Sequence, residues 1–92
     1  MLVQFGALRH TPAGIPAIEF LIRHESQRVE AAASRRVQAE VAALAFDTLA
    51  RQIASASLGA VLTVRGFLAA KNQRSAKLVL HVTDIEFEEG AE

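Results

Sequence analysis

Apolar and polar residues alternate with a period of two along much of the chain, which is the pattern of half-buried β-strands. The clearest example is the segment Ile15–Glu25. Its apolar face holds Ile18, Phe20 and Ile22, and its other face holds Glu19, Leu21 and Arg23. A core is therefore expected on one side of this strand and water on the other.

A tight turn is expected just before that strand. Leu2–Arg9 is predicted to form the first strand, and Thr11-Pro12-Ala13-Gly14 connects it to the second. The proline presets φ for the first central position of a type I turn, and Gly14 supplies the positive φ needed to leave it. The two strands are therefore predicted to pair as a hairpin.

The middle of the chain predicts a loop, a third strand and a short helix. Residues 25–34 are mostly polar or small, which favours a loop, with a short helix as the alternative for its three alanines. Alternation returns over Arg35–Phe46, the expected third strand. Asp47 or Thr48 is then expected to cap a short helix that carries Leu49 and Ile53, and Gly59 to turn the chain back.

Two more strands are expected near the C-terminus. In Ala60–Ala70 the alternation places Leu62, Val64 and Leu68 inward and Thr63, Arg65 and Phe67 outward, and Gly66 indicates a bulge or sharp bend. The polar segment Lys71–Lys77 is expected to be a loop. Beyond it, alternating residues predict a fifth strand that ends near Phe87.

This order of elements predicts an all-β fold, the five-stranded Greek-key OB-fold barrel with a short helix between strands 3 and 4. The pattern alone leaves an SH3-like barrel as an alternative. Ninety-two residues suffice for one domain, expected over residues 1–87, with residues 88–92 as a short acidic tail.

The formal net charge of zero conceals an uneven distribution. Residues 84–92 contain five acidic and no basic residues, whereas residues 1–83 carry ten Lys or Arg against five Asp or Glu, a net charge of +5. Such an excess suits a nucleic-acid partner. The acidic end is expected to be a solvated tail that aids solubility, and the alternative is a mimic of phosphate that competes for the basic surface.

Several classes of function are disfavoured. The chain has no cysteine, which removes disulfide and thiol chemistry and fits a cytoplasmic protein. No segment approaches the roughly 18 apolar residues that span a bilayer. His10, His24 and His81 lack metal-ligand spacing, and neither a serine nucleophile motif nor a phosphate-binding glycine loop occurs. Neither an enzyme nor a metal or other cofactor is therefore expected.

Four segments resemble, in order and spacing, the family of primosomal replication protein N (PriB), dimeric OB-fold relatives of bacterial single-stranded DNA-binding protein. They are Leu8–Pro16, Phe20–Ser26, Val64–Leu68 and Lys77–His81. The resemblance implies a homodimeric replication-restart accessory that binds single-stranded DNA and the PriA helicase and hands the complex on to DnaT.

The resemblance places the main DNA contact between the last two strands, where the cations are Lys71, Arg74 and Lys77. Further cations at strand ends or on the polar face are expected to extend this track: Arg9, His10, Arg23, Arg35 and Arg36. Flexible cationic side chains follow phosphates without reading sequence.

The chain departs from the family in two ways. Some members carry a third-strand aromatic that stacks on a base, but residues 35–39 here have none, and the chain lacks Trp and Tyr. DNA affinity is therefore expected to rest on phosphate contacts and to fall steeply with salt. The first strand, which helps form the family's dimer, is also short.

Some alternatives remain open at the level of sequence. Phe67 is expected to pack in a dimer or beneath the adjacent loop, with a stacking surface as the alternative. The principal rival function is an OB-fold interaction module of the primosome with weak or no single-stranded DNA binding. A conventional single-stranded DNA-binding protein is disfavoured, because the chain lacks a long Gly/Pro-rich linker and a hydrophobic acidic tip.

Overall fold

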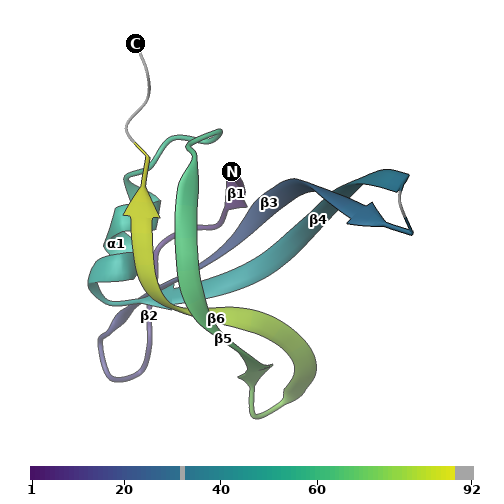
Figure 1. Ribbon diagram of the computed structural model, residues 1–92. Helices are drawn as coiled ribbons and strands as arrows, with labels where there is room; N and C mark the ends of the chain where they lie inside the picture. The colour runs from purple at the N-terminus through teal and green to yellow at the C-terminus, as the bar shows by residue number, and fades with distance from the viewer. Residues whose placement is uncertain (32, 89–92) are drawn as a thin grey trace.

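The computed structural model describes residues 1–31 and 33–88 as six β-strands and one short helix (Figure 1). The strands form a single sheet. In chain order the elements are β1 Leu2–Phe5, β2 Arg9–His10, β3 Pro16–Glu30, β4 Ala33–Phe46, α1 Thr48–Ala54, β5 Leu62–Asn72 and β6 Ser75–Phe87. The predicted all-β class, with a short helix before the last two strands, is confirmed.

The predicted turn before β3 is confirmed, whereas the single first strand is wrong. The Gly14 N–H donates to the Thr11 carbonyl oxygen at 2.8 Å, the hydrogen bond of a β-turn, and Gly14 has a φ of 82°. Residues 6–8 divide the expected first strand into β1 and β2. Gly6 has no side chain to pack in a strand, and pairing resumes only where Arg9 lies opposite Ala17.

The hairpin of β3 and β4 replaces the loop that was expected over residues 25–34. Backbone pairing continues from Ala17 opposite Phe46 out to Glu30 opposite Ala33. We call the outer part, Arg23–Glu30 with Ala33–Glu40, the β3–β4 arm, and Figure 1 shows it projecting from the body. The prediction failed because an antiparallel hairpin satisfies its backbone by cross-strand pairing, so polar residues do not exclude it.

The arm makes the molecule elongated. At 3.4 Å per residue the arm extends about 25 Å. The radius of gyration is 14.9 Å, whereas a compact chain of this length has one of roughly 12 Å.

The hairpin of β5 and β6 bends at Gly66, as predicted. The register shifts between Arg65 and Gly66. A Cβ atom at Gly66 would lie 2.0 Å from the His81 carbonyl oxygen, so no larger residue fits there without displacing backbone. Past this bulge Leu68, predicted to face inward, is 63% exposed. Leu68 lies on β5, the last strand of the sheet, where no further described strand pairs beside it.

The core forms between the inner face of the sheet and α1. Its fully buried large side chains are Leu2, Ile18 and Ile53. Burying one such side chain contributes roughly 1.5–3 kcal/mol. Ile53 thus holds α1 against the sheet, and Leu49 packs at the edge of the core. The expected side-chain cap of α1 is absent, because Asp47 at the cap position has a φ of 58° and makes no capping hydrogen bond.

The strand order is β1-β3-β4-β6-β5, with β2 also paired to β3. β4 and β6 run parallel, and the chain between them includes α1 and β5, the connectivity of an OB-fold. The expected closure of the barrel is incomplete, because β1 has only four residues. Two backbone hydrogen bonds of 2.8 Å, between Leu2 and residues Gly59 and Ala60, bridge the opening between β1 and β5.

Candidate nucleic-acid interface

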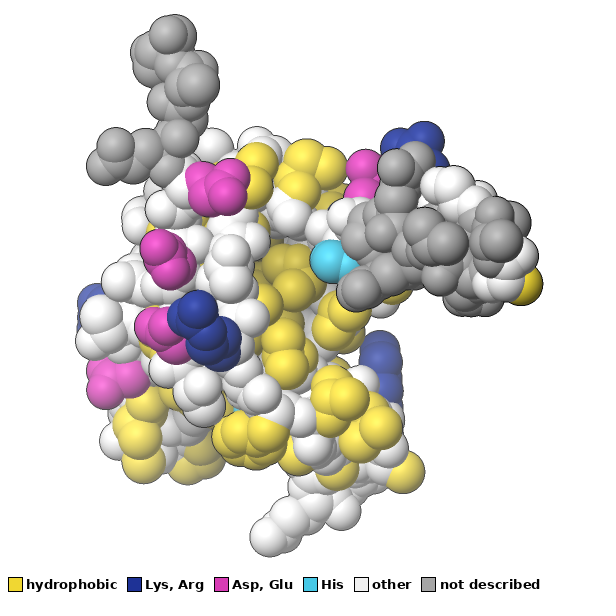
Figure 2. Space-filling model, in the orientation of Figure 1, with side chains coloured by type: hydrophobic (Ala, Val, Ile, Leu, Met, Phe, Trp, Pro, Cys, Tyr) yellow, Lys and Arg dark blue, Asp and Glu magenta, His cyan; other side chains and the backbone are white. Residues whose placement is uncertain are grey.

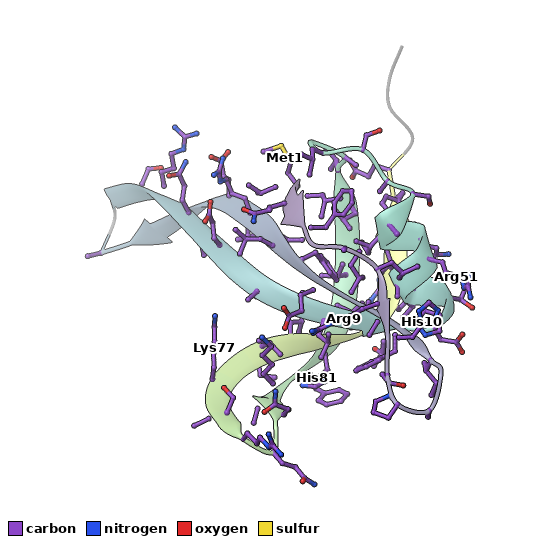
Figure 3. The ribbon with its side chains drawn as sticks, turned by 180° about the vertical axis from the view of Figure 1, so that it is seen from behind. Met1, Arg9, His10, Arg51, Lys77 and His81 are labelled. Carbon is purple, nitrogen blue, oxygen red and sulfur yellow. The ribbon has the colours of Figure 1, made fainter. Side chains whose placement is uncertain are left out.

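Three of the predicted DNA-binding cations surround one carboxylate, that of Glu19 on β3. Lys71 Nζ lies 2.6 Å and Arg9 Nη2 lies 3.5 Å from Glu19 Oε1. Lys77 lines the same groove as Glu19 and Lys71. We call Arg9, Lys71, Lys77 and Glu19 the cationic cluster. The fold assembles it from β2, β3, β5 and β6, and Figure 3 shows Arg9 and Lys77 approaching from different strands.

The cationic cluster lowers the pKa of the Glu19 carboxyl below its usual value of 4.5. The hydrogen bond from Lys71 is the largest cause; desolvation opposes it, and the charges of Lys71, Arg9 and Lys77 add to it. Glu19 is therefore ionised at neutral pH and supplies an anionic oxygen to these cations. A phosphate oxygen offers the same chemistry, so the geometry of the cluster suits an anionic polymer.

A groove of about 280 Å³ lies beside the cluster. Arg9, His10 and Lys71 line it together with the apolar side chains of Leu44 and Phe46. Cations beside an apolar wall suit a chain that alternates charged phosphates with flat bases. His10, predicted to extend the cationic track, therefore lies next to the cluster.

The expected loop over Lys71–Lys77 is instead a two-residue turn between two strands. The Arg74 N–H donates to Asn72 Oδ1 at 2.8 Å, and the Lys77 N–H donates to Ser75 Oγ at 3.2 Å. These side chains stabilise the turn locally, which lets both strands continue into the polar segment. Lys71 and Lys77 are thus held on strands, and Arg74 is exposed at the turn.

The predicted cations of the β3–β4 arm form a second group. Arg23 Nη2 lies 2.6 Å from Glu40 Oε2, and Arg36 Nη2 lies 3.4 Å from Glu25 Oε1. The strand register puts these side chains on the face of β3 and β4 that also carries Glu19. Glu19 and Arg23 are separated by about 14 Å along β3. The predicted side chain of Arg35 lies outside the described part of the structure.

Sequence reasoning missed the stacking of Phe67 on His81. The ring centroids are 5.3 Å apart and the planes differ by 6°. Within the described chain Phe67 is 57% exposed, so it does not pack beneath a loop. The alternation did place Phe67 on the outer face of its strand, but only the register of β5 with β6 puts it directly opposite His81.

The acidic end of the chain meets one described cation, since Asp84 Oδ2 lies 2.9 Å from Arg65 Nη1. Residues 89–92 of the predicted tail lie outside the described residues, so competition between the tail and phosphate stays a prediction.

The three histidines of the metal hypothesis lie on three strands: His10 on β2, His24 on β3 and His81 on β6. Among the described residues, no group of three His, Asp or Glu side chains is placed to hold a metal ion. The described part of the chain also contains no helix with the length and apolar character needed to cross a membrane.

Residues 1–84 match the sequence model of a family described as another single-strand binding protein family. Replication restart protein PriB of Bordetella pertussis is 46% identical over 81 residues, which make up 88% of this chain and 76% of that protein. Replication restart protein PriB of Nitrosomonas europaea is 41% identical over 83 residues, 90% of this chain and 77% of that protein.

Solved structures share the fold. PriB from Ralstonia solanacearum superposes with a TM-score of 0.81 at 32% identity, covering 96% of this chain and 90% of that one. A deletion mutant of the single-stranded DNA binding protein from Thermus aquaticus has a TM-score of 0.73 at 16% identity, covering 91% of this chain and 44% of that one, a likeness of fold alone. The OB-fold, the match over residues 1–84 and these relatives agree, and the chain therefore belongs to the PriB family of replication restart proteins.

Proposed function

We propose that this protein is a non-catalytic accessory of the replication-restart primosome that binds single-stranded DNA electrostatically. Its main DNA contacts are Lys71, Arg74 and Lys77, extended by Arg9 and by the neighbouring cations His10, Arg23, Arg35 and Arg36. It acts in the cytoplasm as a homodimer that binds the PriA helicase and passes the complex to DnaT. The family relationship supports these partners.

The observation that carries this proposal is the gathering of Arg9, Lys71 and Lys77 around the anionic side chain of Glu19. Lys71 and Arg9 are separated by 62 positions in the chain, yet both reach Glu19 Oε1. Exposed ion pairs contribute only about 0–1 kcal/mol each, so these contacts are weak enough to be exchanged. A phosphate that takes the place of the Glu19 carboxylate would meet the same donors, with release of counterions from the DNA.

The triple variant Lys71→Ala/Arg74→Ala/Lys77→Ala tests the proposal. Fluorescence anisotropy with a labelled oligo(dT), measured over a series of salt concentrations, should show weaker binding. The slope of log affinity against log salt should shrink by about two, because each single-strand phosphate contact contributes about 0.7. The control variant Arg51→Ala/Arg65→Ala removes two other cations, Arg51 on α1 and Arg65, which pairs with Asp84. It should bind the oligonucleotide nearly as the wild type does. An unchanged slope in the triple variant would refute the assignment.

A protein-interaction module is the second candidate, and the existing ion pairs favour it. Glu19, Glu25 and Glu40 already neutralise four of the predicted cations. Reversing the charge of Lys71 and Lys77 separates the two functions. Under this second function the reversal would disturb a pull-down with PriA and leave oligonucleotide binding nearly unchanged, whereas DNA binding should collapse under the first.

A further inference from the structure

The exposed aromatic pair of Phe67 and His81 has no role in the core. Phe67 is 57% exposed, although its ring is one of the large apolar groups of the chain. One face of the ring is covered by the His81 imidazole, whose plane is parallel to within 6°. The exposed area leaves the opposite face of the ring accessible.

The backbone holds this pair in place. His81 Nε2 lies 3.0 Å from the Ala70 carbonyl oxygen, which fixes the orientation of the imidazole. The close approach of Gly66 to the His81 carbonyl fixes the bulge that precedes Phe67. A flat surface that is rigid before binding loses little conformational entropy when a second flat group stacks on it.

The pair lies in the same cross-strand row as Glu19, the carboxylate at the centre of the cationic cluster. Glu19 pairs with Leu44, Leu44 with His81, and His81 with Phe67. Directly paired residues share one face of a sheet, and three strand spacings amount to about 14 Å. In Figure 3, Arg9, Lys77 and His81 lie together in the lower half of the molecule, around β4 and β6.

We infer that the open face of Phe67, backed by His81, is a stacking platform for one unpaired base of the bound strand. This rests on the proposed function, and it supplies the aromatic surface that residues 35–39 lack. The cations around Glu19, at the other end of the row, meet phosphates of the same strand. An OB-fold site of roughly 4–16 nucleotides is long enough to cover both.

Further exposed apolar residues lie on the other face of the β5–β6 hairpin, opposite the face that carries Phe67 and His81. Leu68 is 63% and Leu78 is 62% exposed, and Figure 2 shows hydrophobic side chains gathered in the centre and lower part of the visible face. A second copy of the chain is the other occupant that such a surface suits. The cations that surround Glu19, at the other end of the row, favour the nucleic acid as the occupant of the Phe67 face, and the test separates the two.

Phe67→Leu keeps an apolar side chain and removes the aromatic face. With oligo(dT) its dissociation constant should rise roughly five- to hundredfold, the range of base-aromatic stacking, with an unchanged salt slope. With an abasic strand of the same length, Phe67→Leu and wild type should bind equally. Arg65→Ala, two residues away on β5, is the matched control and should behave as wild type on both strands. Thermal unfolding checks that each variant is folded.

Phe67→Trp gives a second readout, since the chain has no other Trp and no Tyr. A base that stacks on the introduced indole should quench its fluorescence, and an abasic strand should not.

The platform would be overturned if Phe67→Leu lost affinity equally for oligo(dT) and the abasic strand, or lost none for either. It would also be overturned if the indole of Phe67→Trp stayed unquenched at saturation with oligo(dT). A lower sedimentation mass of Phe67→Leu with unchanged DNA binding would also overturn it and assign the surface to self-association. Absence of wild-type binding to oligo(dT) would overturn the proposed function and the platform together. If the wild type binds oligo(dT) and the triple variant Lys71→Ala/Arg74→Ala/Lys77→Ala shows the reduced salt slope, the proposed function stands. That result does not depend on the outcome for the Phe67 variants.

Discussion

At the scale of single residues, Glu19 limits how tightly the cations of the cationic cluster can bind a phosphate. Its carboxylate accepts a hydrogen bond from Lys71 and lies close to Arg9, so a phosphate must displace it to reach those donors. One set of cations therefore serves both an internal ion pair and the proposed DNA contact. Removing the Glu19 charge should favour binding at the expense of the folded state.

Glu19→Gln is expected to tighten oligo(dT) binding by roughly three- to tenfold, since one close charge is worth about 1 kcal/mol near water. Anisotropy titrations at low and moderate salt measure this gain. Glu86→Gln makes the same change of charge on the exposed part of β6 and should leave binding nearly unchanged. An equal gain in both variants would mean that only the total charge of the protein matters.

The lowered pKa of Glu19 also predicts how stability depends on pH. A carboxyl whose folded pKa lies below 4.5 stabilises the fold above that pH and loses this contribution as the pH falls through the lowered value. Urea unfolding at pH 7 should give wild type an advantage over Glu19→Gln of less than about 1 kcal/mol, because the paired side chains are partly solvated. The advantage should shrink as the pH is lowered below 4.5. An advantage that grows on acidification would contradict this cause.

At the scale of elements, the bulge of β5 depends on the absence of a side chain at Gly66. Gly66→Ala would bring a Cβ atom to 2.0 Å from the His81 carbonyl oxygen, and the backbone must move. We expect a loss of about 1–3 kcal/mol in the free energy of unfolding, measured with urea. Gly6→Ala is the matched control, since its Cβ would lie 3.7 Å from the nearest oxygen. A neutral Gly66→Ala would show that the hairpin bends without the bulge.

Comparison of the elements shows why some features can be predicted from the sequence and others cannot. The Thr11–Gly14 turn and the Gly66 bulge follow from the backbone preferences of single residues, and both were predicted. The β3–β4 arm was missed, because its strands are held by pairs such as Arg23 with Glu40, seventeen positions apart. Lys71 and Lys77 were placed on a loop for the same reason. The surroundings of Glu19 need four strands in place, so no pattern local to Glu19 predicts them.

At the scale of the whole molecule, the chain divides into a body that holds the core and an arm whose described side chains take no part in it. The buried residues of the core cluster lie on β1, on β3 before Arg23, on β4 after Glu40, and on α1 and β6. The described ion pairs of the arm, Arg23 with Glu40 and Arg36 with Glu25, are exposed. Stability is therefore expected to come from the body, and the arm to serve a binding role.

Replacing residues 25–38 by Asn-Gly tests this division, because it joins His24 directly to its cross-strand partner Ala39 through a favoured hairpin turn. The free energy of unfolding should change by no more than about 1 kcal/mol, since a shorter connection costs little and none of the described core residues is removed. Oligo(dT) affinity and its salt slope should both fall, because the arm cations are gone. Arg35→Ala/Arg36→Ala in the full-length chain should reproduce much of that fall. A shortened protein that unfolds, or that binds DNA as the wild type does, would contradict the division of labour between body and arm.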